Sequence, residues 1–234
     1  AVQFLVDATA AGLVDARDEI RSAVDAFVSA GGFFGSTNTD TEDPKENVSY
    51  AIAFETLLAA GELLDDQATV DAAYELCLRP LTRFELVRDL NGQRTKGLLF
   101  MEDAWNAACT WETAQVSHAY LVAYGDTGHR PYVLKALTIL RAMALHHHGP
   151  FGFLTEAVDW DGHSPTLRHF PGERYGDIAT THPFLNNLQV VLPTVAFLER
   201  FARAVKVDDG EFLFDVEGNR LCSMPPPAAD WMTP

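Results

Sequence analysis

The side chains best suited to chemistry lie between residues 152 and 187. Glycoside hydrolysis uses two carboxyl groups beside the scissile bond, one as a proton donor and one as a base or nucleophile. Glu156 and Asp159 supply such a pair, and Trp160 next to Asp159 offers an aromatic face for a sugar ring. The sequence therefore predicts Asp159 and Glu156 as the acid and base. Asp161 could join them, although an Asp residue before Gly is also a common turn former.

The same stretch also holds the groups that proton abstraction next to a sugar carboxylate requires. That chemistry needs a base, an acid and a group that neutralises the carboxylate. His182, Tyr175, His169, Asn186 and Arg174 supply groups of these types. His182 could instead belong to a helix cap, because it stands between a threonine and a proline.

Several further residues are expected to contact the substrate rather than to react. They combine aromatic rings, imidazoles, a guanidinium and an amide: Trp160, His118, Arg174, His169, Asn186 and Trp111. Other acids also stand close to tryptophans, namely Glu102 and Asp103 before Trp105 and Glu112 after Trp111. A structural role remains open for each, since a lone histidine inside a helix is often a packing residue and acids often cap helices.

Metals and cofactors are not predicted. His146, His147 and His148 are consecutive, so their side chains point in different directions on a helix, and favourable interaction with the helix dipole explains them more simply. The three cysteines lack metal-binding spacing, and the acids around Gly162 lack the further ligands of a calcium loop. The sequence also has no glycine-rich phosphate loop.

Charge and composition limit the classes of partner. The chain has 234 residues, 47% of them hydrophobic, and a formal net charge of −16, so it can bury a core and repels polyanions. We therefore expect neither nucleic acid nor membrane as a partner. No apolar run reaches the roughly 18 residues that a membrane span needs. A carbohydrate substrate is compatible with this surface.

The elements that position these residues are mostly helical by their periodicity. Helices are predicted over residues 2–30 (two helices), 48–64, 69–82, 111–124, 131–147 and 184–205. Turn signals at Asn91–Gly92, Asp161–Gly162 and Glu217–Gly218 indicate a small hairpin after successive helix pairs. Such a repeat predicts an all-α fold of stacked helical hairpins, with β-hairpins on one rim. We expect one domain over residues 1–222 and a proline-rich tail over 223–234.

The turn between two of these helices carries a family resemblance. Residues 124–132, Tyr-Gly-Asp-Thr-Gly-His-Arg-Pro-Tyr, resemble the inter-helix turn of α/α-toroid glycan enzymes, and residues 63–73 are similar to a weaker second copy. These families include unsaturated glucuronyl hydrolases, N-acylglucosamine 2-epimerases and toroid polysaccharide lyases. The resemblance implies an (α/α) toroid that acts on a carbohydrate. About seven helices make an incomplete ring: an open half-ring, a fragment of a larger toroid, or a ring that a homo-oligomer or a partner chain completes.

Three hypotheses follow. The leading one is a glycoside hydrolase that uses the carboxyl groups of Asp159 and Glu156. The second is a polysaccharide lyase or sugar epimerase that depends on His182 and Tyr175. The third is a non-catalytic scaffold or subunit of stacked helical hairpins, because a fold does not determine a function.

Overall fold

The computed structural model describes residues 1–32, 46–90, 95–100, 107–146, 157–159, 183–200, 202–208, 211–216 and 219–224. Contacts between residues divide the chain into two compact units, one within Ala1–Phe84 and one that begins at Glu85. Each unit contains its own buried apolar residues. The single domain expected over residues 1–222 and the tail after it stay predictions.

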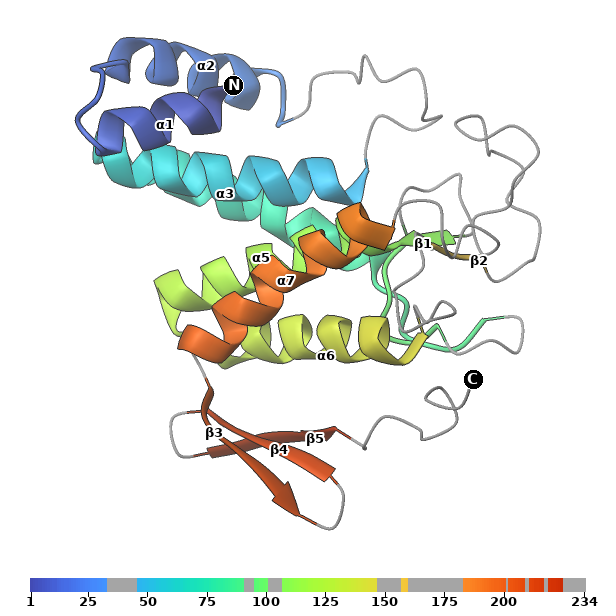
Figure 1. The fold of residues 1–234 in the computed structure, drawn as a ribbon. Helices are drawn as coiled ribbons and strands as arrows, with labels where there is room; N and C mark the ends of the chain where they lie inside the picture. The colour runs from blue at the N-terminus through green and yellow to red at the C-terminus, as the bar shows by residue number, and fades with distance from the viewer. Residues whose placement is uncertain are drawn as a thin grey trace. The chain divides into compact units, whose positions relative to one another are not determined.

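The first unit consists of helices (Figure 1). They are α1 (Val2–Ala10), α2 (Arg17–Ser29), α3 (Asn47–Leu64) and α4 (Gln67–Ala72), which continues as a π-helical turn, η1 (Ala73–Leu78), and a 3₁₀ turn, η2 (Arg79–Phe84). Fully buried side chains from α2, α3 and the helical run after it, including Ile20, Phe54 and Leu81, form its core. The predicted helices 48–64 and 69–82 are confirmed within one to two residues.

The polar break between these two helices has a clear local cause. Asp65 adopts a left-handed conformation with φ of 51° and ends α3. The Asp66 carboxylate then accepts hydrogen bonds from the backbone N–H of Ala68 at 3.1 Å and from the Thr69 hydroxyl at 2.9 Å. This N-cap satisfies backbone donors that have no partner inside the helix. Gly61 allows the return helix to approach closely, because a Cβ atom there would lie 2.7 Å from Val70 Cγ2.

The second unit is built around a helix that packs against two others. Strand β1 (Ala107–Cys109) leads directly into α5 (Thr110–Thr127), and α6 (Arg130–His146) follows after Gly128, whose φ of 66° ends α5. Helix α5 packs against both α6 and α7 (Pro183–Arg200) (Figure 1). This double packing explains why α5 is rich in small residues, which permit close approach.

An extended segment precedes β1 and forms a short antiparallel pair. The N–H of Leu86 donates to the Leu98 carbonyl at 2.9 Å, and the N–H of Gly97 donates to the Leu86 carbonyl at 2.8 Å. Glu85 and Leu99 form a β-bridge in the same pair. The pairing agrees with the hairpin predicted there, while Asn91–Gly92 itself lies outside the described residues.

The C-terminal region corrects one predicted helix. Helix α7 ends at Arg200 rather than at residue 205, and three antiparallel strands follow in the order β3–β4–β5: β3 (Ala202–Asp208), β4 (Glu211–Val216) and β5 (Asn219–Met224). Residues 202–208 are rich in alanine and valine, and such a short apolar stretch fits a helix or a strand until a partner strand decides. Val216 pairs with Asn219 across the β4–β5 ladder, which agrees with the turn predicted there, while Glu217–Gly218 itself lies outside the described residues.

The described part of the chain is therefore mostly helical, with seven helices if α4, η1 and η2 count as one run. This confirms the all-α character that the periodicity predicted. Within these described residues, the β structure is one two-stranded sheet, one three-stranded sheet and the isolated bridge between Glu85 and Leu99.

Candidate functional site

A short β-ladder fixes the predicted acid-bearing segment at the start of α5. Strand β2 (Ala157–Asp159) pairs antiparallel with β1, so that Asp159 lies opposite Ala107 and Ala157 opposite Cys109. This pairing joins two segments that lie about fifty residues apart in the sequence. Asp159 pairs with Ala107, two residues before Cys109, and Cys109 immediately precedes α5. The backbone of Asp159 therefore lies beside a point on β1 that is roughly 7 Å along the strand from the start of α5.

The first turn of α5 contains a fully buried acid, Glu112. A carboxyl group without access to water is costly unless neighbouring groups interact with it, and Glu112 does interact with its surroundings. Thr110, Thr113 and Ser117 are also completely buried, and the Ser117 hydroxyl donates to the Ala136 carbonyl of α6 at 3.3 Å. The N-terminal half of α5 is thus unusually polar for a helix packed on two sides.

One face of α5 stays half-exposed and carries two of the predicted substrate residues. Trp111 and His118 are seven residues apart, which places them within about 20° of each other around the axis and about 10 Å apart along it. Gln115 lies between them on the same face, and all three are half-buried. The structure therefore brings Trp111 and His118 together, and it adds Gln115, which the sequence analysis missed. We call these three residues the α5 polar face.

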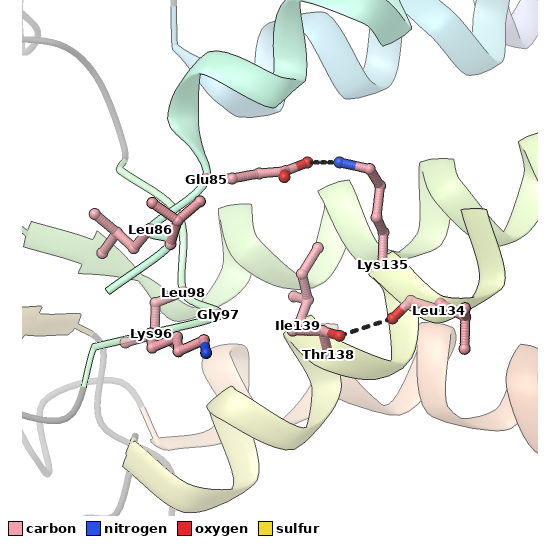
Figure 2. A pocket seen from close by; sticks show the side chains of 10 residues that line it. Glu85, Leu86, Lys96, Gly97, Leu98, Leu134, Lys135, Thr138 and Ile139 are labelled. Atoms are coloured by element: carbon pink, nitrogen blue, oxygen red, sulfur yellow. Dashed lines mark hydrogen bonds and ion pairs between the residues drawn. The ribbon is translucent and has the colours of Figure 1, made fainter. Parts of the chain in front are cut away.

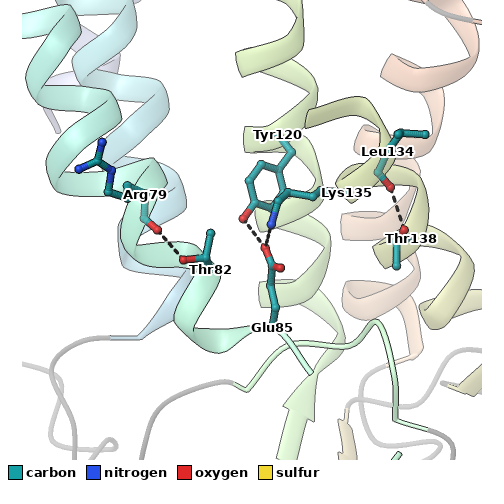
Figure 3. Close-up of polar contacts among 7 residues, drawn as sticks. All are labelled: Arg79, Thr82, Glu85, Tyr120, Leu134, Lys135 and Thr138. Carbon is teal, nitrogen blue, oxygen red and sulfur yellow. Dashed lines mark hydrogen bonds and ion pairs between the residues drawn. The ribbon is translucent and has the colours of Figure 1, made fainter. Parts of the chain in front are cut away.

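A second polar cluster joins the extended segment 85–99 to α5 and α6. The Tyr120 hydroxyl donates to Glu85 Oε1 at 2.8 Å, and the Lys135 ammonium donates to the same oxygen and forms an ion pair with it (Figure 3). The ammonium also lies 5.3 Å from the centre of the Tyr120 ring. The same ring stacks on Tyr132, with 6.2 Å between ring centres.

The electrostatic state of this cluster follows from its burial. Burial raises the pKa of the Tyr120 hydroxyl far above its ordinary value of 10.0, and the neighbouring Glu85 carboxylate raises it further. Tyr120 is therefore a neutral hydrogen-bond donor at every physiological pH. Its ring is 1% exposed, whereas the Glu85 side chain is 26% exposed, so the carboxylate reaches the surface while its anchor does not.

Glu85 and Lys135 also line a cavity of about 290 Å³ between the segment 85–98 and α6 (Figure 2). Its walls are mainly aliphatic, and Lys96 is its second cationic group. No sequence pattern identified this cluster, because its three members are 35 and 50 residues apart.

The remaining predicted site residues divide into two groups. Asp159 is placed by its backbone in β2 and Asn186 in the first turn of α7, but their side chains lie outside the described part of the structure. The others lie wholly outside it: Glu156, His182, Tyr175, Trp160, Arg174 and His169. Their predicted roles stay predictions.

Two general findings apply to the described residues. No helix among them is both long and apolar enough to cross a membrane. Within the same residues, no three His, Cys, Asp or Glu side chains gather in a way that could hold a metal ion.

Comparisons with protein-family models, with curated proteins and with solved structures gave no match to this chain.

Proposed function

We propose that this protein is a carbohydrate-active enzyme, and specifically a glycoside hydrolase of the α/α-toroid type. The observation that carries the proposal is the α5 polar face, where an indole, an amide and an imidazole form the half-exposed side of residues 110–121, whose other side chains are buried. A sugar presents an apolar ring face and hydroxyl groups that both donate and accept. Aromatic and polar side chains together match this pattern.

The β1–β2 ladder supports the assignment of the acids. It anchors the backbone of Asp159 beside the end of α5 that carries Trp111 and Glu112. In the proposed reaction one carboxyl group, from Asp159 or Glu156, protonates the glycosidic oxygen as the bond to the anomeric carbon breaks. The other carboxylate takes a proton from the attacking water or attacks the anomeric carbon itself, and its distance from the first decides which.

The decisive experiment compares amide variants on a panel of neutral and uronate-containing oligosaccharides. We expect Asp159→Asn and Glu156→Gln to lower kcat by at least about a hundredfold, since general acid–base catalysis contributes roughly that much or more. The matched control is Asp126→Asn, an exposed acid at the other end of α5, which should leave turnover unchanged. Circular dichroism should show that all three variants fold.

The two alternative hypotheses give different results in the same assay. A lyase forms an unsaturated product that absorbs in the ultraviolet, and its turnover would depend on His182 and Tyr175 while Asp159→Asn stays active. A non-catalytic scaffold would turn over no substrate of the panel. Either result would overturn the proposed hydrolase.

The α5 polar face is tested separately through substrate affinity. Trp111→Ala and His118→Ala should each raise KM about tenfold, because aromatic and hydrogen-bonding contacts to a bound ligand contribute roughly 1–2 kcal/mol each. Gln115→Ala should act in the same direction. Unchanged KM in all three variants would remove the observation on which the proposal depends.

The predicted completion of the ring remains part of this proposal. Seven helices would form only part of a six-hairpin toroid, and of the three alternatives (an open half-ring, a fragment, or a ring completed by another chain) we propose the third. Light scattering gives the solution mass of the chain, and a monomer that hydrolyses its substrate at full rate would contradict this expectation.

A further inference from the structure

The cavity between the segment 85–98 and α6 is a compact site with an apolar body and a charged edge. Five aliphatic side chains form its walls: Leu86, Val87, Leu98, Leu134 and Ile139. Its volume of about 290 Å³ lies at the lower end of the range of small-molecule sites. Val87 is 75% exposed and Leu134 is 38% exposed, so the apolar surface continues from the cavity to its mouth.

Close backbone packing gives the cavity its shape. Gly97 has a φ of 94°, and a Cβ atom there would lie 3.1 Å from both Ala142 Cβ and Thr138 Cγ2 of α6. The absence of a side chain at this position lets the segment 95–98 approach α6. The Asp89 carboxylate accepts hydrogen bonds from the backbone N–H groups of Thr95 and Lys96, each at 3.0 Å. These bonds hold the backbone from which the Lys96 side chain extends.

The charges at the cavity do not cancel. Lys135 is neutralised by Glu85, whose position is held by the buried Tyr120 hydroxyl. Lys96 is exposed, and its ammonium makes no ion pair with any described residue. Figure 2 shows this ammonium directed toward α6, apart from the Glu85–Lys135 pair. The lining residues comprise two cations and one anion, so Lys96 is the lining cation that has no ion-pair partner among the described residues; the Asp89 carboxylate binds its backbone N–H.

We propose that this cavity binds a small amphipathic monoanion, a carboxylate on an apolar body, with the carboxylate at Lys96 and the body against the aliphatic walls. A hydroxyl-rich ligand is disfavoured, because its polar groups would lose their hydrogen bonds to water against Leu and Ile side chains. A ligand with a cationic head is also disfavoured, because the ammonium groups of Lys96 and Lys135 would repel it. The site is distinct from the α5 polar face, and the inference does not depend on the proposed hydrolase activity.

The test uses three probes that separate charge from apolar surface. Octanoate carries both features, 1-octanol only the apolar body and glucuronate only the charge. Titration of the whole chain by calorimetry or NMR should show saturable one-to-one binding of octanoate, at least tenfold weaker binding of 1-octanol and none of glucuronate. Raising the salt concentration should weaken octanoate binding, because Lys96 is exposed.

Two matched variants locate the charge. Lys96→Met keeps the apolar stem and removes the ammonium, and it should weaken octanoate binding about tenfold, as loss of a hydrogen bond to a charged group does. Arg88→Met removes an exposed cation from the same segment that does not line the cavity, and it should change binding less than twofold. Leu134→Trp, which fills the cavity, should abolish binding.

Several results would overturn the proposal. Octanoate could fail to saturate, or 1-octanol could bind as tightly as octanoate. Equal weakening by Lys96→Met and Arg88→Met would show a non-specific charge effect instead of a site. Undiminished binding to a folded Leu134→Trp variant would place octanoate elsewhere.

Discussion

Removing the Tyr120 hydroxyl is the sharpest test of how the Glu85 cluster is held together. Tyr120→Phe keeps the ring, which is 1% exposed, and with it the stacking on Tyr132 and the contact with Lys135. The variant loses only the 2.8 Å hydrogen bond to Glu85 Oε1. Any effect therefore reports that single bond.

The expected magnitude follows from the surroundings of the carboxylate. A hydrogen bond to a charged group contributes about 1.5–3 kcal/mol. Glu85 keeps Lys135 in the variant, and its side chain is 26% exposed, so water can replace part of the lost bond. We expect the free energy of unfolding to fall by about 1–1.5 kcal/mol, which lowers Tm by roughly 2–6 °C for a chain of this size.

A double-mutant cycle with Lys135→Met sharpens the result, because both donors bind the same carboxylate oxygen. Their effects should be non-additive by about 0.5 kcal/mol or more. The assay is thermal and urea unfolding followed by circular dichroism. A Tm unchanged within error in Tyr120→Phe, or strict additivity in the cycle, would refute the reasoning.

The pH dependence gives an independent check. The folded-state pKa of Tyr120 is raised, so its contribution is fully present below the ordinary pKa of 10.0. Above that pH the unfolded chain ionises at this residue while the folded chain does not, and stability is lost as pH rises. Tyr120→Phe should lose less stability than the wild type between about pH 9.5 and 11.

Three further predictions concern the first unit. Gly61→Ala should destabilise the chain by about 1–2 kcal/mol in urea unfolding, because the new Cβ atom would collide with Val70. Helix propensity alone would favour Ala by about 1 kcal/mol, so a stabilised Gly61→Ala variant would contradict the packing. A Val70→Ala background should recover part of the loss. Burial raises the pKa of the Cys77 thiol to about 12, so thiol reagents at pH 8 should modify it only after denaturant is added, and rapid labelling of the native chain at this residue would contradict its burial. The hydrogen bond from the Thr69 hydroxyl holds the pKa of Asp66 below its usual 3.8. Its contribution to the free energy of unfolding is therefore present above pH 3.8 and lost on acidification. Thr69→Val should flatten the pH dependence of stability below about pH 4, and an unchanged slope would count against the N-cap.

The local order of elements could be predicted from the sequence because it depends on near neighbours. Apolar periodicity located α3, α5 and α6 within a few residues of their observed ends. The polar break at Asp65–Asp66 was visible because turn formers and N-cap residues act over one to four residues. The predicted end of α7 was wrong because it depends on a partner strand: residues 202–208 form a strand through pairing with β4.

The candidate site divides in the same way. Trp111 and His118 could be placed on one face of a helix from their spacing alone, because seven residues make two turns. The sequence also drew attention to Asp159, but the pairing of its strand with β1 joins segments fifty residues apart, and no local pattern encodes that.

What the sequence by itself determined is therefore the helical character and most helix boundaries. Only the tertiary structure decided that Glu85, Tyr120 and Lys135 meet at one carboxylate oxygen and that an aliphatic cavity lies beside them. The physical reason is that helix periodicity and capping are short-range. A hydrogen bond between distant segments exists only after packing has brought their side chains within about 3 Å.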